Sequence, residues 1–393
     1  MRYQRRAPTS DELNNDLVAG GWAVRSYSGA TVYPPNANIN TMRWQVQADP
    51  IYAARNSAKS FSPSPSSGSI GTVLAYTFPA PATHWYMGVR LSHKRNGANP
   101  NISNLVTIGS QGIRKAGNTD TGLGGSRPTN TWDCLLQFDQ VTGKTFTGIS
   151  NAYVEVTSYL YPTGSDVYIE VMVDTVNNLV RVWVNDLLIV DGAFNATILA
   201  AAKAAYDQGF GIMASSGASS GTSVSEVIMR DIYALKVDAT APFARLGGTT
   251  QVLGEKPTDD AQAQFVRPNG YADNADVAAL PVIPNPTVYL TGDTIGQEDR
   301  YTAAGSTVAT AASIIHAVGV KTQIANYAAA AHEVAAVVKP AGGTNTGVSS
   351  MGAITPGVGF VNHARYFPTN PDTGVAWTPT EAGAAQFGLR VLS

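Results

Sequence analysis

The sequence predicts a mostly β protein with more than one domain, on three observations. With 393 residues the chain is longer than a single hydrophobic core usually serves. Apolar and polar residues alternate at a period of two along several short runs, as they do in half-buried strands. The 38 glycines and 22 prolines indicate frequent turns between those runs. We therefore expect two β-rich domains.

The chain up to residue 238 is predicted to form the larger β domain, after a polar arm at residues 1–16. Alternation is clearest in His84 to Leu91, Tyr153 to Tyr159 and Val167 to Val173. One helix fits within this part, from Asn195 as N-cap to Tyr206, because strong helix formers fill that stretch. This domain is assigned residues 17–238.

The clearest hairpin lies in VYIEVMVDTVNNLVRVWVNDLLIVDG. The apolar run breaks at Asp174 to Asn178, and a second turn at Asn185 and Asp186 returns the chain. Between the turns the side chains divide over two faces, with Val180, Val182 and Val184 on one and Arg181 with Trp183 on the other. Which of these faces is buried stays open at this point.

Residues 239–275 are polar and irregular, so they are predicted to be the crossing segment between the domains. Alternation then resumes in residues 276–393, with strands expected at 287–290, 314–324, 332–339, 360–367 and 386–392. Before the last strand, Thr378, Pro379 and Glu381 supply an N-cap, a first-turn proline and a capping-box acid. Trp377 directly precedes this short helix and is the candidate structural anchor of the domain.

Composition and charge exclude several classes of protein. The 26 basic and 28 acidic residues give a formal charge of −2, so no general attraction to nucleic acid is expected. No 18-residue apolar run and no signal-peptide core appear, and membrane insertion is therefore not expected. The single cysteine, Cys134, cannot form an internal disulfide and is expected to be a buried apolar residue.

Two stretches resemble known families. The hairpin above, followed by VSEVIMRDIYAL, resembles the closing strands of concanavalin A-like (laminin G-like) jelly rolls, which implies a lectin-type sandwich of two sheets. Residues from about Asp231 to Ser393, and NPDTGVAWTPTEAGAAQFGLRV above all, are similar to the C-terminal part of bacteriophage tail and virion-associated proteins. That similarity implies a second, smaller β-sandwich domain with a short C-terminal helix.

No catalytic residue and no enzymatic activity are predicted. Glu170 and Asp174 are the only nearby carboxylates of a glycosidase type, but four residues of extended strand separate their Cα atoms by ~13 Å. Glycosidase carboxyl pairs lie ~5 to 10 Å apart. We expect Glu170 on a solvated strand face and Asp174 at the start of a turn. The scattered histidines give no metal signature and no cofactor is expected.

Two ligand hypotheses remain open. Lectin-like sandwiches often bind calcium through loop oxygens, for which Asp120, Asp133, Asp139 and Asn151 are candidates without a fixed-spacing signature. Glycan binding needs exposed aromatic rings beside polar groups. The candidate glycan-binding residues are Trp85, Tyr86, Tyr159, Tyr161 and Trp183, all of which also suit an ordinary core.

The predicted function is that of a structural component of a bacteriophage particle, associated with its tail, baseplate or fibre. Its expected partners are other virion proteins and copies of itself, and its expected location is the virion after synthesis in the host cytoplasm. The alternatives are a host-recognition module that binds cell-surface glycan and a capsid decoration protein.

Overall fold

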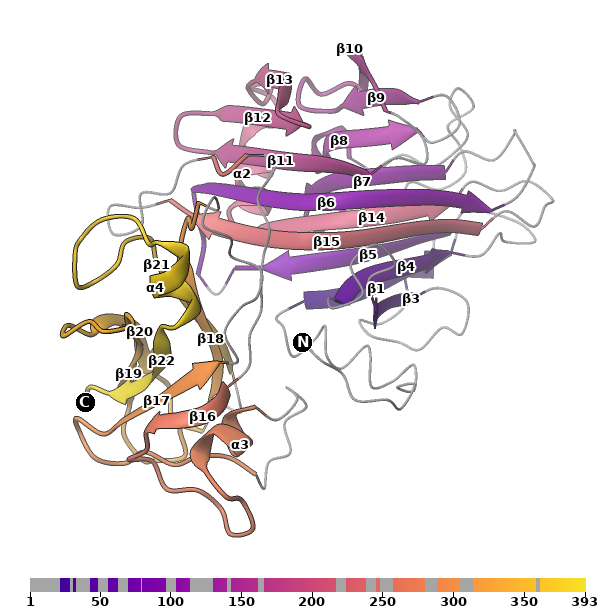
Figure 1. Cartoon of the computed structure of the whole chain (residues 1–393). Helices are drawn as coiled ribbons and strands as arrows, with labels where there is room; N and C mark the ends of the chain where they lie inside the picture. The colour runs from indigo at the N-terminus through magenta and orange to yellow at the C-terminus, as the bar shows by residue number, and fades with distance from the viewer. Residues whose placement is uncertain are drawn as a thin grey trace. The chain divides into compact units, whose positions relative to one another are not determined.

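The structure is a computed structural model of the chain. It describes residues 22–28, 31–32, 43–48, 56–62, 70–78, 80–96, 104–113, 130–139, 143–161, 166–216, 224–237, 245–247, 257–279, 288–303, 314–357 and 361–393. The polar arm predicted at residues 1–16 and the calcium candidate Asp120 lie outside this part. The predicted mostly β fold is confirmed, since antiparallel sheets dominate (Figure 1). No helix in the described part has the length and apolar character that crossing a membrane requires.

The chain divides into two compact units, Arg2–Val252 and Leu253–Ser393. The first unit is a sandwich of two antiparallel sheets. The eight-stranded sheet has the order β10 (Val154–Leu160), β9 (Lys144–Thr147), β8 (Cys134–Asp139), β7 (Asn104–Ser110), β14 (Gly209–Ser216), β5 (Ile70–Thr77), β1 (Trp22–Ser28) and β2 (Thr31–Val32). The seven-stranded sheet has the order β13 (Leu187–Gly192), β12 (Leu179–Val184), β11 (Asp166–Asp174), β6 (His84–Asn96), β15 (Val224–Lys236), β4 (Asn56–Ser62) and β3 (Arg43–Ala48).

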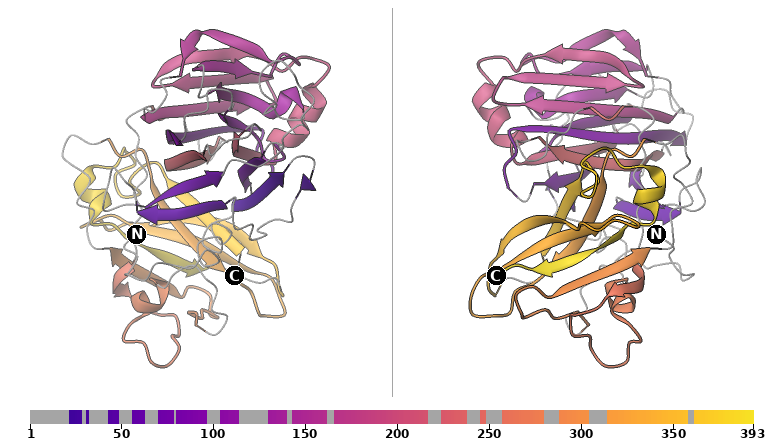
Figure 2. Two further views of the ribbon diagram at one scale, coloured as in Figure 1. Left: turned by 90° about the vertical axis from the view of Figure 1, so that its right-hand side faces the viewer. Right: turned by 60° about the vertical axis from the view of Figure 1, so that its left-hand side comes forward.

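The core of the first unit lies between its two sheets, whose layers are seen edge-on in Figure 2. The predicted hairpin is confirmed as β11 and β12, and its valine face is the buried one. Leu74, Ile108 and Ile212 meet these valines from the eight-stranded sheet. Cys134 is buried at the start of β8, as expected. Asn185 and Asp186 both adopt positive φ, which is the backbone of a tight hairpin turn.

The helix of the first unit, α2 (Leu199–Tyr206), has Ile198 as its N-cap and so begins three residues later than predicted. Asn195 closes a local turn instead of capping the helix, because its side chain accepts the backbone N–H of Thr197. The helix brings Tyr206 against a short 3-10 turn, η1 (Thr131–Asp133), where the Tyr206 hydroxyl donates to the carbonyl of Trp132. This hydrogen bond joins the helix to the connection that contains η1, so both pack against the core.

The second unit contains a five-stranded and a two-stranded antiparallel sheet. The larger has the order β16 (Pro257–Gln262), β17 (Glu298–Ala303), β22 (Gln386–Val391), β19 (His332–Lys339) and β20 (Gly347–Ile354), and the smaller pairs β18 (Val318–Ile324) with β21 (Val361–Phe367). Two short helices, α3 (Asn274–Ala278) and α4 (Pro379–Gly383), complete the described part. Its core joins side chains of both sheets, namely Val320, Ala336, Val338, Met351 and Phe367, with Trp377 and Ala385, which flank α4.

The segment 239–275, predicted to be a crossing between domains, contains a strand and the start of a short helix in its second half. Pro257–Gln262 forms β16 and pairs with β17, and the unit boundary falls at residues 252 and 253. Side chains hold this region together where apolar alternation is missing. Asp260 accepts the backbone N–H groups of Asn274 and Ala275, and the buried Asp299 accepts those of Gln264 and Phe265. Two carboxylates, of which Asp299 is buried and Asp260 partly exposed, therefore order a stretch whose composition predicts a loop.

Trp377 is buried in the core of the second unit. Its indole Nε1 donates to the carbonyl oxygen of Phe367 at 2.8 Å, which links the residue to β21. The capping box predicted for the next helix is present, since the Thr378 side chain accepts the Glu381 N–H and Glu381 accepts the Thr378 N–H. The contribution of Trp377 to stability stays a prediction.

Candidate functional site

The face of the seven-stranded sheet that points away from the core carries an unusual number of polar and aromatic side chains. Cross-strand pairing arranges them in rows, because residues directly opposite one another share a face. One row runs from Tyr233 on β15 through Gly88 on β6 and Glu170 on β11 to Trp183 on β12. This outer face is the candidate site.

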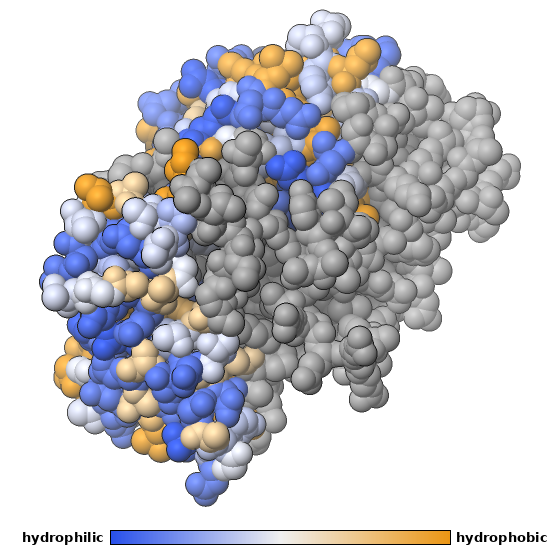
Figure 3. Space-filling view, in the orientation of Figure 1, coloured by the Kyte–Doolittle hydropathy of each residue, from blue (hydrophilic) through white to orange (hydrophobic). Residues whose placement is uncertain are grey.

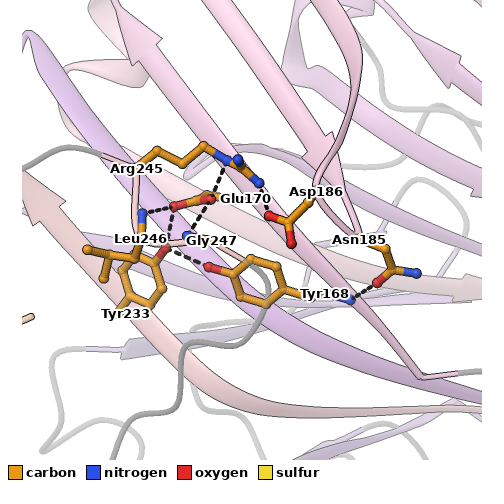
Figure 4. Close-up of polar contacts among 8 residues, drawn as sticks. All are labelled: Tyr168, Glu170, Asn185, Asp186, Tyr233, Arg245, Leu246 and Gly247. Carbon is orange, nitrogen blue, oxygen red and sulfur yellow. Dashed lines mark hydrogen bonds and ion pairs between the residues drawn. The ribbon is translucent and has the colours of Figure 1, made fainter. Parts of the chain in front are cut away.

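Glu170 lies at the centre of this row and is fully buried (Figure 4). Its carboxylate accepts the Tyr233 hydroxyl at 2.6 Å and the backbone N–H groups of Leu246 and Gly247 at 2.8 and 3.3 Å. Arg245 Nε lies 2.9 Å from its Oε2. The expectation of a solvated Glu170 is wrong, because residues 245–247 cover it. Through three hydrogen bonds and one ion pair, this carboxylate acts as a clamp for that segment.

Two buried tyrosines extend the network. The hydroxyls of Tyr168 and Tyr233 lie 2.7 Å apart, and since Tyr233 donates to Glu170, Tyr168 donates to Tyr233. Burial, reinforced by the neighbouring Tyr168 and the Glu170 charge, holds the pKa of Tyr233 far above its usual value. Tyr233 therefore stays protonated and remains a donor. Asn185 accepts the backbone N–H of Tyr168, which connects the network to the β12–β13 turn.

Arg245 joins the clamp to the surface (Figure 4). Its guanidinium carbon lies 5.0 Å from the centre of the Trp183 ring, a cation–π arrangement, and it also pairs with Asp186. The next residue, Leu246, packs beside Tyr86 on a small apolar cluster of Tyr168, Tyr233 and Leu235 outside the main core. Polar and apolar contacts together fix residues 245–247 on the outer face.

A second charged group lies toward the other end of β6 and β11. Arg230, which is almost fully buried, pairs with Asp166 at 2.8 Å and donates to the Ser92 hydroxyl at 2.7 Å. Its cross-strand neighbour Arg90 lies 3.7 Å from Asp166 and 3.5 Å from Asp231. Two arginines side by side are thus compensated by two aspartates within the sheet.

The structure separates the five glycan-binding candidates. Trp85 points into the core and donates its indole N–H to the Tyr206 carbonyl, and Tyr161 is also buried, so neither ring is available for stacking. Tyr159 packs against the edge of the same core. Tyr86 and Trp183 are partly exposed, and both lie on the outer face. Glycan binding by these two residues stays a prediction.

The remaining sequence candidates do not assemble a catalytic or metal site. Asp174 opens a turn as expected, since it accepts both the backbone and the side-chain N–H of Asn177. The Asp133 carboxylate accepts hydrogen bonds from the Ser110 hydroxyl and from the side-chain amide of Asn130. Among the residues that the structure describes, no three His, Cys, Asp or Glu side chains gather as metal ligands would. Asp139 therefore belongs to no such group there, and the Asn151 side-chain oxygen accepts the Thr131 hydroxyl.

No family model and no curated protein matches the chain. Solved structures do resemble it, at low identity. A sialidase matches with 10% identity and a TM-score of 0.34 over 56% of this chain and 17% of its own. An alginate lyase from Klebsiella pneumoniae matches with 9% identity and a TM-score of 0.34 over 58% and 99%. A lectin from Bauhinia forficata matches with 13% identity and a TM-score of 0.29 over 54% and 99%.

These likenesses are too weak to transfer a substrate or a residue role to this chain. They do correct one expectation. The prediction that the chain is not an enzyme is wrong as an exclusion, because alginate lyases and a sialidase are among the similar structures beside the lectin. One fold carries different chemistries, so a sandwich without a glycosidase-like carboxylate pair is not thereby a binding protein.

Proposed function

We propose that the first unit, Arg2–Val252, binds carbohydrate on the outer face of its seven-stranded sheet. The observation that carries the proposal is the position of Trp183, a partly exposed indole flanked by the fixed charged groups of Arg245 and Asp186. Tyr86 lies two strands away in the neighbouring row of the same face.

The chemistry of a sugar matches this surface. A pyranose ring offers a weakly polar C–H face, which packs on an aromatic ring, and a rim of hydroxyls, which need donors and acceptors at fixed positions. Here Trp183 supplies the aromatic ring. Arg245 supplies donors and Asp186 acceptors, and a second pair, Arg181 with Asp191 at 3.0 Å, lies in the next row. The Glu170 clamp holds Arg245 in position before any ligand arrives, which reduces the ordering cost of binding.

Glycan-array binding of the full chain, followed by titration calorimetry with the best oligosaccharide, tests the proposal. Trp183→Ala and Tyr86→Ala are expected to weaken binding at least ~10-fold, about 1.4 kcal/mol. Tyr327→Ala, which truncates an exposed tyrosine of the other unit, is the matched control and should bind as the unaltered chain does. Absence of binding to any glycan, or equal binding by all variants, overturns the proposal. Measuring new reducing ends in the same samples separates binding from cleavage.

A second candidate is membership of a bacteriophage particle, as a tail-associated or decoration component that contacts other virion proteins. Its support is the C-terminal segment that resembles phage virion proteins. A turn at 371–373, the buried Trp377, the capped α4 and the terminal β22 follow one another there in the order that the resemblance implies. Mass spectrometry and antibody labelling of purified particles test this candidate. Its detection at constant stoichiometry supports location in the virion, and its absence from particles contradicts it.

A further inference from the structure

Exposed apolar side chains of the first unit gather on two strands. Among the described residues of this unit, five large hydrophobic side chains are exposed, and four of them lie on β10 and β13. These four are Val154 (46% exposed), Leu160 (68%), Leu187 (53%) and Leu188 (42%). Hydrophobic surface is visible at the β10 and β13 end of the unit in Figure 3. Single exposed apolar residues are ordinary, but a cluster of them marks an interaction surface.

The position of these strands adds a second observation. β10 is the last strand of the eight-stranded sheet, β13 is the last strand of the seven-stranded sheet, and the two lie side by side. Within the part of the chain that the structure describes, each therefore has one backbone edge that pairs with no other strand. β10 is paired with β9 only near its two ends, because the register shifts between Glu155 and Leu160. Soluble proteins commonly protect such edges with lysine or proline, and neither occurs in VEVTSYL or LLIVDG.

The charged residues of these two strands indicate what kind of partner could bind there. β10 carries Glu155, which pairs with Lys144 at 2.8 Å, and β13 carries Asp191, which pairs with Arg181 at 3.0 Å. Both acids are thus neutralised by partners within the same chain. Among the residues of these two strands, a second copy would therefore meet no uncompensated like charge. Together with their two basic partners, the same residues carry no net charge that would favour an oppositely charged partner. An edge that is apolar and internally neutral is complementary to itself.

We propose that two copies of this chain associate through the edge formed by β10 and β13. A two-fold axis places the same strands of both copies in contact, which is the commonest symmetry of homodimers. Strands of six and seven residues extend ~20 Å. Two such strands and their four exposed apolar side chains would form the centre of the contact, and each partner of a stable complex buries ~800 Å² in all.

The mass of the full chain in solution tests the inference. Sedimentation velocity from about 1 to 200 μM should show a dimer that dissociates on dilution, an affinity range common for reversible complexes. Leu160→Glu and Leu188→Glu, which place a charge in the contact, should weaken the dimer at least ~10-fold. Val176→Glu is the matched control, because Val176 is equally exposed (67%) but lies in the β11–β12 turn, and it should dimerise normally.

A cross-linking experiment confirms which edge is used. Ser158→Cys introduces an exposed thiol in the middle of β10, while the native Cys134 is buried. Oxidation of the dilute variant should yield a disulfide-linked dimer, whereas Val176→Cys should stay monomeric under denaturing electrophoresis. A wild-type chain that is monomeric at all concentrations, or a dimer that both glutamate variants leave unchanged, overturns the inference. The circular dichroism spectrum of each variant shows whether it is folded.

Discussion

Gly88 on β6 and Tyr233 on β15 are paired across the sheet, and the Tyr233 ring occupies the space that a side chain at position 88 would need. The hydroxyl of the same ring donates to Glu170. The absence of one side chain thus allows a buried tyrosine to reach the carboxylate that holds residues 245–247.

Gly88→Ala is therefore expected to displace the Tyr233 ring and to lower the free energy of unfolding of the first unit by ~1 to 3 kcal/mol, the usual cost of overpacking. Urea denaturation followed by tryptophan fluorescence measures the change. Gly112→Ala is the control in the same unit, because the nearest atom to its new Cβ would lie 3.8 Å away. Equal stability of the two variants would show that the ring has room to move.

Glu170→Gln should release residues 245–247 from the outer face. The amide keeps the size of the carboxylate but removes the charge that Arg245 faces, and its NH₂ group opposes one of the three hydrogen-bond donors. Hydrogen exchange of the Leu246 and Gly247 amides should accelerate, and stability should fall by ~1 to 3 kcal/mol. Asp191→Asn, which alters an exposed ion pair of the same face, should leave those amides unchanged. Unaltered exchange in Glu170→Gln would contradict the clamp.

The sequence predicts the strands of this site better than it predicts the site. Alternation identifies β11 and β12 because valine and isoleucine fill one face continuously. The same alternation assigns Glu170 to solvent, since nothing local shows that residues 245–247, some 75 positions away, will cover it. Arg245 belongs to an irregular polar stretch and has no periodic signal. The one local signal was Gly88, a glycine inside an alternating run, which indicates a close approach by another group.

In the second unit, periodicity predicts strands with apolar faces and misses those ordered by polar contacts. The predicted bounds of β19, residues 332–339, agree with the observed ones at both ends. Its centre is a run of four buried residues, which gives a clear apolar signal in the sequence. β16 reads PTDDAQ and offers no apolar face, yet Asp260 fixes the strand to α3. Buried hydrogen bonds between distant residues leave no periodic trace in sequence.

Trp377→Ala should lower the free energy of unfolding of the second unit by ~3 to 5 kcal/mol, the usual range for deleting a buried aromatic side chain. It leaves a cavity among Phe367 and Met351, and the Phe367 carbonyl loses its donor. Differential scanning calorimetry of the full chain measures the effect. The neighbouring Val375→Ala, which truncates a side chain that is largely exposed, should leave the midpoint within about a degree. An unchanged midpoint for Trp377→Ala would rule out an anchoring role.

The capping box predicts a pH dependence. The backbone and hydroxyl donors of Thr378 hold the pKa of Glu381 below its ordinary value of 4.5. A carboxyl whose folded-state pKa is depressed stabilises the fold above its unfolded pKa, and this contribution is lost as the pH falls through the folded value. Proton titration by NMR should place Glu381 below 4.5, and Thr378→Ala should return it toward that value. Because alanine keeps the backbone N–H, the return should be partial, and a Glu381 pKa at or above 4.5 in the unaltered chain would contradict this origin of the shift.

The only thiol of the chain, Cys134, is buried at the start of β8 in the first unit. A thiol reagent can therefore react only when that sandwich opens, and opening of the second unit exposes no thiol at all. The rate at which the unaltered protein is labelled consequently measures the opening of the first unit alone. Measured with and without an oligosaccharide, it would report ligand binding as a slower rate, without any probe at the binding surface.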